Sequence, residues 1–237
     1  EGEFKRGYNI PVCRCRFAVM DPELTYTLPA YQTACGVADI MMHIMERYFV
    51  RDDTLMVTDG MAEAVIRAVL RCGTILRDHP ADYKARAEVL WAGSLAHNSL
   101  MNCGGPTGDW ASHQLEMELS GMFGVAHGAG LTAIWGSWAR YVLDEKPERF
   151  GQFAQQVFGI PCGDDPKAAA LQGIEAMEDY YRSIAMPTNL RELGVKHITE
   201  EQIEEMAEKC TYFGRRTIGQ FKVLQKEDIK AIYRMAR

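Results

Sequence analysis

The sequence lacks the features that would place the protein in a membrane or on a nucleic acid. No apolar run approaches the roughly 20 residues that span a bilayer, and the opening residues, EGEFKRGYNIPVCRCRF, have no apolar signal-peptide core. The net charge is −6, and the lysines and arginines are scattered among acidic residues rather than gathered into a basic stripe. We therefore expect a cytoplasmic protein with no membrane partner and no nucleic-acid partner.

The cysteines also lack the spacing of a known kind of site. There are seven, an odd number, and none forms a CxxC pair of the zinc-knuckle type. Cys13 and Cys15 alternate along a segment with a strand-like pattern, and we interpret them as small buried hydrophobic residues. We assign the cysteines no chemistry.

What the sequence has in abundance is helical periodicity. Apolar residues recur at three-and-four spacing throughout the chain after residue 30. We expect about nine helices, within residues 34–50, 59–78, 82–101, 109–124, 128–145, 147–159, 166–186, 199–214 and 226–236. The one expected strand is RFAVM, closed by the turn DPEL. Because a single strand cannot form a sheet, we expect residues 1–20 to be the tail of another domain.

Four polar residues in apolar or small-residue surroundings are candidates for chemistry. Asp39 and His43 are four residues apart, which places a carboxylate and an imidazole on one helix face, and a hydrogen bond between them would satisfy both. His113 lies inside a later helix, and His127 opens the run HGAG, whose glycines allow a close approach to the backbone. Together they would suit Fe(II), Zn(II), Mn(II) or Ni(II), whereas each histidine alone is also explained as a satisfied core residue.

Three stretches of the sequence resemble the iron-containing alcohol dehydrogenases, most closely their butanol dehydrogenase-like branch. They are FAVMDPELTYTLPAYQTACGVADIMMHIMERYF, GDWASHQLEMELSGMFGVAHGAGLTAIWGSWARYV and FKVLQKEDIKAIYRMAR, in the order found in that family. The resemblance implies a mainly α chain: the helical C-terminal domain of the dehydroquinate synthase-like fold. Residues 29–237 would form the metal-binding domain, and residues 1–28 a strand and linker left from an α/β cofactor domain.

The resemblance also implies a site and an activity. In that family one aspartate and three histidines hold the metal, and the matching positions are Asp39, His43, His113 and His127. Fe(II) is the first expectation, with Zn(II), Mn(II) or Ni(II) as alternatives, and the complete enzyme would use NADP or NAD. The metal acts as a Lewis acid on the substrate oxygen while a hydride passes to or from the nicotinamide. The implied enzyme interconverts small primary alcohols and aldehydes, and we expect a homo-oligomer.

Two features depart from the family pattern. The chain contains neither a GGGS-type loop for the cofactor pyrophosphate nor a G-x-G-x-x-G between a strand and a helix. We therefore expect the 237-residue chain by itself to fold, bind metal and turn over no alcohol. Met117 stands where many relatives carry a further histidine, and a thioether cannot relay a proton. An altered proton path and a tolerated packing change are both open.

Two other classes of function remain as alternatives. One is a non-catalytic helical domain for metal binding or oligomerisation, which nucleotide binding would separate from a dehydrogenase. The other is a metal-dependent hydrolase, which the same donors could serve by activating water. The hydrolase is less favoured because the sequence has no HD doublet and no H-E-x-x-H motif.

Overall fold

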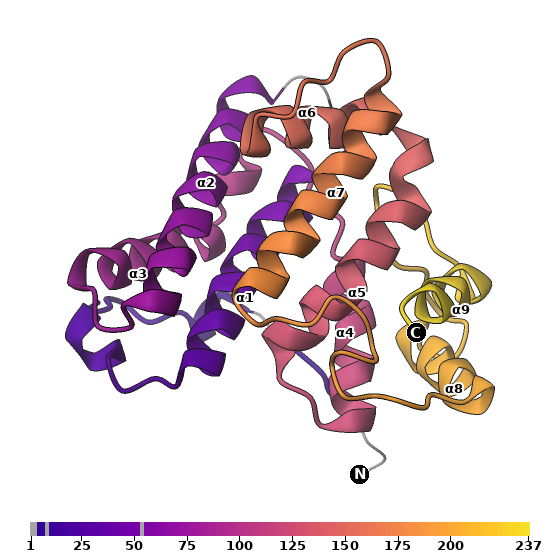
Figure 1. The fold of residues 1–237 in the computed structure, drawn as a ribbon. Helices are drawn as coiled ribbons and strands as arrows, with labels where there is room; N and C mark the ends of the chain where they lie inside the picture. Colours follow the sequence, from indigo (N-terminus) through magenta and orange to yellow (C-terminus); the bar gives the residue numbers. More distant parts are fainter. Residues whose placement is uncertain (1–3, 8–9, 53–54) are drawn as a thin grey trace.

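The computed structural model describes residues 4–7, 10–52 and 55–237, and in these residues the chain is a stack of helices (Figure 1). The α-helices are α1 (Ala30–Tyr48), α2 (Met56–Asp78), α3 (Tyr83–His97), α4 (Ala111–Phe123), α5 (His127–Val142), α6 (Pro147–Phe158), α7 (Pro166–Ser183), α8 (Glu200–Cys210) and α9 (Lys226–Met235). Short 3-10 helices lie at η1 (Pro11–Cys13), η2 (Pro22–Thr25), η3 (Leu100–Asn102) and η4 (Leu143–Glu145). All nine expected helices and the mainly α class are confirmed.

Side-chain caps explain where several helices begin. The Asp82 carboxylate accepts a hydrogen bond from the Ala85 N–H and so caps the start of α3. Thr199 and Gln202 form a reciprocal capping box at the start of α8. These local signals are readable in the sequence, so the helix boundaries follow from it closely.

Helix α1 runs through the middle of the molecule and packs against α2, α3 and α5. Helices α6 and α7 form a pair on one side, and the α8–α9 pair covers α4 and α5 on another (Figure 1). The core is aromatic where α1 ends, because Phe49 stacks on Phe150 with ring centroids 4.4 Å apart. No helix among the described residues is long and apolar enough to cross a membrane. The central position of α1 matters because that helix carries Asp39 and His43.

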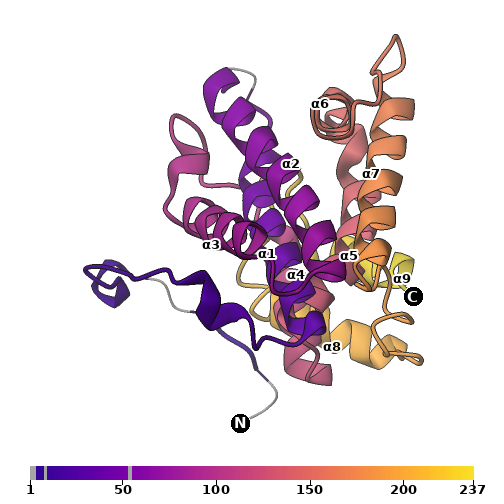
Figure 2. The ribbon, with the colours of Figure 1, turned by 60° about the vertical axis from the view of Figure 1, so that its left-hand side comes forward.

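The expected strand RFAVM is wrong for the structure as described. Residues 14–20 have no ladder hydrogen bonds, and the described part of the chain contains only an isolated bridge, between Ile218 and Leu224. Figure 2 shows this segment as an arm outside the helical body. A strand pattern needs a second strand to pair with, and no described segment offers one. The division at residue 28 remains a prediction.

The interpretation of the two neighbouring cysteines is also wrong. Cys13 and Cys15 are both exposed rather than buried. Their burial was inferred from a sheet face, and without a sheet the alternation of side chains has no core to point into.

Candidate metal centre

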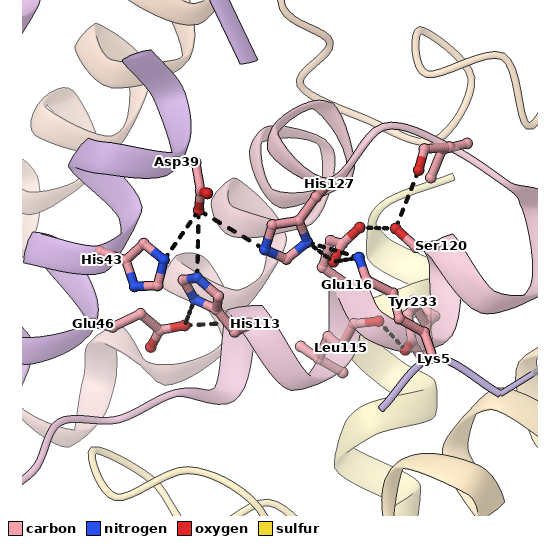
Figure 3. A network of polar contacts seen from close by, with 11 residues as sticks. Lys5, Asp39, His43, Glu46, His113, Leu115, Glu116, Ser120, His127 and Tyr233 are labelled. Carbon is pink, nitrogen blue, oxygen red and sulfur yellow. Dashed lines mark hydrogen bonds and ion pairs between the residues drawn. The ribbon is translucent and has the colours of Figure 1, made fainter. Parts of the chain in front are cut away.

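Three helices bring the four predicted ligand residues to one place (Figure 3). Helix α1 supplies Asp39 and His43 on one face, α4 supplies His113 from its first turn, and α5 begins at His127. The Nε2 atoms of His43 and His113 each lie 3.5 Å from Asp39 Oδ1, and Nε2 of His127 lies 3.8 Å from the same oxygen. Three imidazole nitrogens therefore converge on one carboxylate oxygen.

This arrangement fits a divalent cation. Asp39 Oδ1 and His113 Nε2 are buried polar atoms that make no hydrogen bond. Donors held about 2.1 Å from a tetrahedral ion lie about 3.4 Å from each other, close to the separations in this site. Among the described residues Asp39, His43 and His113 offer donor atoms within 4.8 Å of one another, and His127 lies at the edge of the group with its side chain 32% exposed. Oxygen and imidazole donors without thiolate suit Fe(II) and Zn(II).

Two buried glutamates approach the far side of these imidazoles. Glu46 Oε1 lies 2.9 Å from His113 Nδ1 and accepts a second hydrogen bond, also 2.9 Å long, from the His113 backbone N–H. Glu116 Oε2 contacts His127 Nδ1 and accepts a hydrogen bond from Lys5 Nζ at 3.1 Å. Sequence reasoning missed both glutamates. Spacing along the chain gave no signal for them, because each glutamate contacts a histidine of another helix.

Burial and neighbouring charges shift the pKa values of the site residues in different directions. Burial lowers the pKa of His43 to about 3, and the neighbouring His113 adds to this effect. Burial also acts to lower the pKa of His113, but its contacts with the carboxylates of Asp39 and Glu46 outweigh burial and raise the pKa to about 9. Burial of Asp39 acts to raise its pKa, yet the surrounding histidines lower it overall. His43 is therefore a neutral imidazole, the form that binds a metal.

Two aromatic rings and one arginine contact or surround His43. His97, exposed at the end of α3, packs its ring against His43 with centroids 3.8 Å apart, and the Trp110 ring lies 5.7 Å away, edge on. The Arg47 guanidinium stacks over Trp110 at 4.6 Å and donates a 2.6 Å hydrogen bond to the His43 carbonyl oxygen. These contacts restrict the rotamer of His43.

The fold and this donor cluster define a helical domain with a candidate centre for a divalent metal. A family model described as "Fe-containing alcohol dehydrogenase family, C-terminal" matches residues 33–237. The chain therefore belongs to the iron-containing alcohol dehydrogenase family, as its sequence motifs indicated.

Individual relatives agree with this assignment. The chain is 36% identical over 231 residues to NADH-dependent butanol dehydrogenase A of Clostridium acetobutylicum, a match that covers 97% of this chain and 58% of the relative. It is 30% identical over 221 residues to the NADPH-dependent aldehyde reductase YqhD of Escherichia coli, covering 93% of this chain and 56% of the relative. The chain thus spans somewhat more than half the length of these proteins.

Solved structures show the same helical arrangement. The crystal structure of NADH-dependent butanol dehydrogenase A from Thermotoga maritima superposes with a TM-score of 0.83 at 32% identity, over 91% of this chain and 55% of that one. The substrate- and cofactor-free aldehyde reductase of Escherichia coli gives a TM-score of 0.84 at 28% identity, over 91% of this chain and 56% of that one.

Proposed function

We propose that Asp39, His43, His113 and His127 hold one divalent metal ion, with Fe(II) as the first candidate. The complete protein would be an NAD(P)-linked oxidoreductase that interconverts small primary alcohols and aldehydes. The observation that carries this proposal is the convergence of three imidazole Nε2 atoms on Asp39 Oδ1, at 3.5, 3.5 and 3.8 Å. The names of the relatives support the substrate class, since they are a butanol dehydrogenase and an aldehyde reductase. They include one NADH-dependent and one NADPH-dependent protein, so the proposal keeps NAD and NADP together.

The residues of this chain have defined tasks in such a reaction. When bound, the metal supplies Lewis acidity that polarises the substrate oxygen. One carboxylate and three neutral imidazoles compensate only half of a dication's charge, so the site keeps a net positive charge of about one. His97, which is exposed and packs against His43, is a solvent-facing neighbour of the site. The helices exclude water behind His113, whose exposed fraction is 9%.

The metal site is tested by the metal content of purified chain after anaerobic reconstitution with Fe(II). We expect about one ion per chain in the native sequence, with ligand distances of about 2.0–2.2 Å by X-ray absorption. The variants His113→Ala and His127→Ala should each lose most of the metal. His79→Ala, which alters an exposed histidine just after α2, serves as the matched control and should retain it. Equal metal content in all four proteins would refute the site.

The reaction is tested by restoring the part of the relative that this chain does not match. We would fuse the unmatched N-terminal part of the Clostridium acetobutylicum butanol dehydrogenase to this chain and follow reduced nicotinamide with butanal or butanol. The fusion should turn over, Asp39→Asn in the same fusion should not, and the 237-residue chain alone should not. A fusion that binds metal and nucleotide but transfers no hydride would favour the non-catalytic helical domain instead.

A further inference from the structure

We propose that Glu46 and Glu116 are positioning residues that fix the tautomers of His113 and His127, so that each histidine presents an unprotonated Nε2 to the centre. The inference rests on the metal site of the proposed function and goes beyond its ligands. Both carboxylates are buried, with exposed fractions of 2% for Glu46 and 0% for Glu116. A buried carboxylate is costly unless charge or hydrogen bonds compensate it, so these two need a structural reason to be where they are.

The geometry at His113 determines which ring nitrogen carries the proton. An ionised carboxylate only accepts hydrogen bonds, and Glu46 Oε1 lies 2.9 Å from His113 Nδ1. The His113 backbone N–H donates to the same oxygen, also at 2.9 Å, which fixes the position of the carboxylate relative to the ring. The proton must therefore sit on Nδ1, and in the neutral ring Nε2 is left with a free lone pair, 3.5 Å from Asp39 Oδ1.

At His127 three groups meet: an ammonium that can only donate, a carboxylate that accepts, and a ring nitrogen whose role depends on the tautomer. Lys5 Nζ lies 3.0 Å from His127 Nδ1 and 3.1 Å from Glu116 Oε2, and an ammonium group can only donate. If Nδ1 accepted from Lys5, its lone pair would face the Glu116 carboxylate at contact distance, and the two would repel. Both Lys5 and Nδ1–H therefore donate to Glu116. This again leaves Nε2 free to face Asp39.

Each of the two glutamates contacts a histidine of another helix in the site. Glu46 lies on α1 and supports a histidine of α4, and Glu116 lies on α4 and supports a histidine of α5. The fold makes room for Glu116 at Gly130, where a Cβ atom would lie 2.8 Å from Glu116 Cγ. His43 provides an internal contrast, because its Nδ1 is buried without a hydrogen-bond partner. The pattern thus singles out the two histidines that come from outside α1.

The test compares Glu46→Gln and Glu116→Gln with Glu118→Gln in the 237-residue chain. Glu118 is a matched control because it is 2% exposed, lies on the same helix as Glu116, and pairs with Arg6 rather than with a histidine. Zinc affinity would be measured by competition with a chelating indicator. We expect each of the first two variants to lose roughly 10- to 100-fold in zinc affinity, the usual effect of removing such a partner. Glu118→Gln should stay within about twofold of the native chain.

A spectroscopic readout separates tautomer control from general destabilisation. In the zinc-loaded chain labelled with ¹⁵N-histidine, all three liganding histidines carry Nδ1–H, and we expect hydrogen-bonded signals from His113 and His127 only, because His43 Nδ1 has no hydrogen-bond partner. Glu46→Gln should remove or shift only the first, and Glu116→Gln only the second. If circular dichroism shows that a glutamine variant is unfolded, Glu46→Asp or Glu116→Asp replaces it in the experiment. The aspartate keeps the negative charge but is one methylene shorter, so its carboxylate lies farther from the histidine Nδ1. We expect it to weaken the same Nδ1–H signal and to lower the zinc affinity.

The outcomes of this test are distinct. A native chain that binds no zinc would overturn the metal site itself. A native chain that binds zinc, with glutamate variants that bind equally well and keep both Nδ1–H signals, would overturn only the positioning role. An equal loss of affinity in Glu118→Gln would also overturn it, because the effect would then be one of net charge.

Discussion

Met117 lies one helical turn beyond His113 on α4, at the position where the sequence resemblance led us to expect a histidine. Its side chain is partly buried and faces the N-terminal segment, since a Cβ atom at Gly7 would lie only 3.8 Å from Met117 Cε. A thioether in this place can fill space but cannot transfer a proton. The methionine is explained either by an altered proton path or by a tolerated packing change, and a substitution at this position can decide between them.

We expect Met117→His to change the pH dependence of the reaction. In the active fusion described above, the variant should add a titration near the unperturbed imidazole pKa of about 6.5 to the profile of kcat/KM. Met122→His, a partly buried methionine later on the same helix, is the control and should leave the profile unchanged. A profile that Met117→His does not alter would favour the packing explanation.

Single residues also show how far the site could be predicted. Asp39 and His43 were readable because they are one turn apart on one helix, and their placement follows from helical geometry alone. His113 and His127 needed the family motifs, since their meeting depends on how α4 and α5 pack. Glu46 and Glu116 were missed because each contacts a histidine of a different helix. Spacing within a helix does not predict such a contact.

At the scale of elements, the run HGAG shows what approaches the backbone. The sequence indicated a close approach at its glycines, and the structure places the backbone of α1 there. A Cβ atom at Gly128 would lie 2.3 Å from the carbonyl oxygen of Cys35. This contact sets the spacing between α1, which carries Asp39 and His43, and the start of α5, which carries His127.

We therefore expect Gly128→Ala to separate α5 from α1. Alanine favours a helix by about 1 kcal/mol over glycine, but a clash with backbone cannot be relieved by a rotamer change, and overpacking typically costs about 1–3 kcal/mol. Thermal unfolding should shift to lower temperature and zinc retention should fall. Gly60→Ala in α2 is the control, because nothing lies within 4 Å of its Cβ position, and it should be neutral or stabilising. Equal behaviour of the two variants would contradict this account.

Asp109 connects two elements next to the site. Its carboxylate accepts hydrogen bonds from the backbone N–H groups of Ala111, Gln220 and Phe221, so it connects the start of α4 to the loop before α9. The N-cap residue of α4 is Trp110, which makes no side-chain cap hydrogen bond, so Asp109 holds the start of the helix from one residue before the cap. Burial, reinforced by the negative charge of Glu46, raises the pKa of Asp109 to about 7.

This raised pKa makes the free energy of unfolding fall as the pH rises. The folded chain keeps the proton on Asp109 up to about pH 7, whereas the unfolded chain releases it near pH 4, so the stabilising contribution is complete below pH 4 and is lost as the pH rises to 7. Asp109→Asn should remove this part of the slope. Chemical unfolding from pH 5 to 8 measures it. A slope equal in the variant and the native chain would show that another group is responsible.

The helices and the strand differ in predictability for one physical reason. A helix satisfies its backbone hydrogen bonds within itself, so capping by Asp82 and the apolar period of α3 were enough to locate it. A strand needs a partner from elsewhere in the chain, and the alternation in RFAVM carries no information about whether one exists. The same gap explains why Cys13 and Cys15 were assigned to a buried face.

At the scale of the whole molecule, the N-terminal arm is the feature that the helical body does not cover. Val12, Phe17 and Val19 are each 83% exposed, on a segment whose backbone has no ladder partner. Exposed apolar side chains beside unpaired backbone groups favour pairing with another chain.

We therefore predict that the 237-residue chain self-associates weakly, with residues 12–20 of two copies pairing as strands. Sedimentation velocity over a wide concentration range should show a concentration-dependent dimer. Phe17→Lys with Val19→Lys should leave a monomer, because the charges repel in the paired strand. Met56→Lys with Val57→Lys changes equally prominent apolar residues, 84% and 77% exposed at the start of α2, and should leave the dimer intact. If that pair dissolves the dimer and the arm variants do not, the contact lies at α2, and the strand-pairing hypothesis fails.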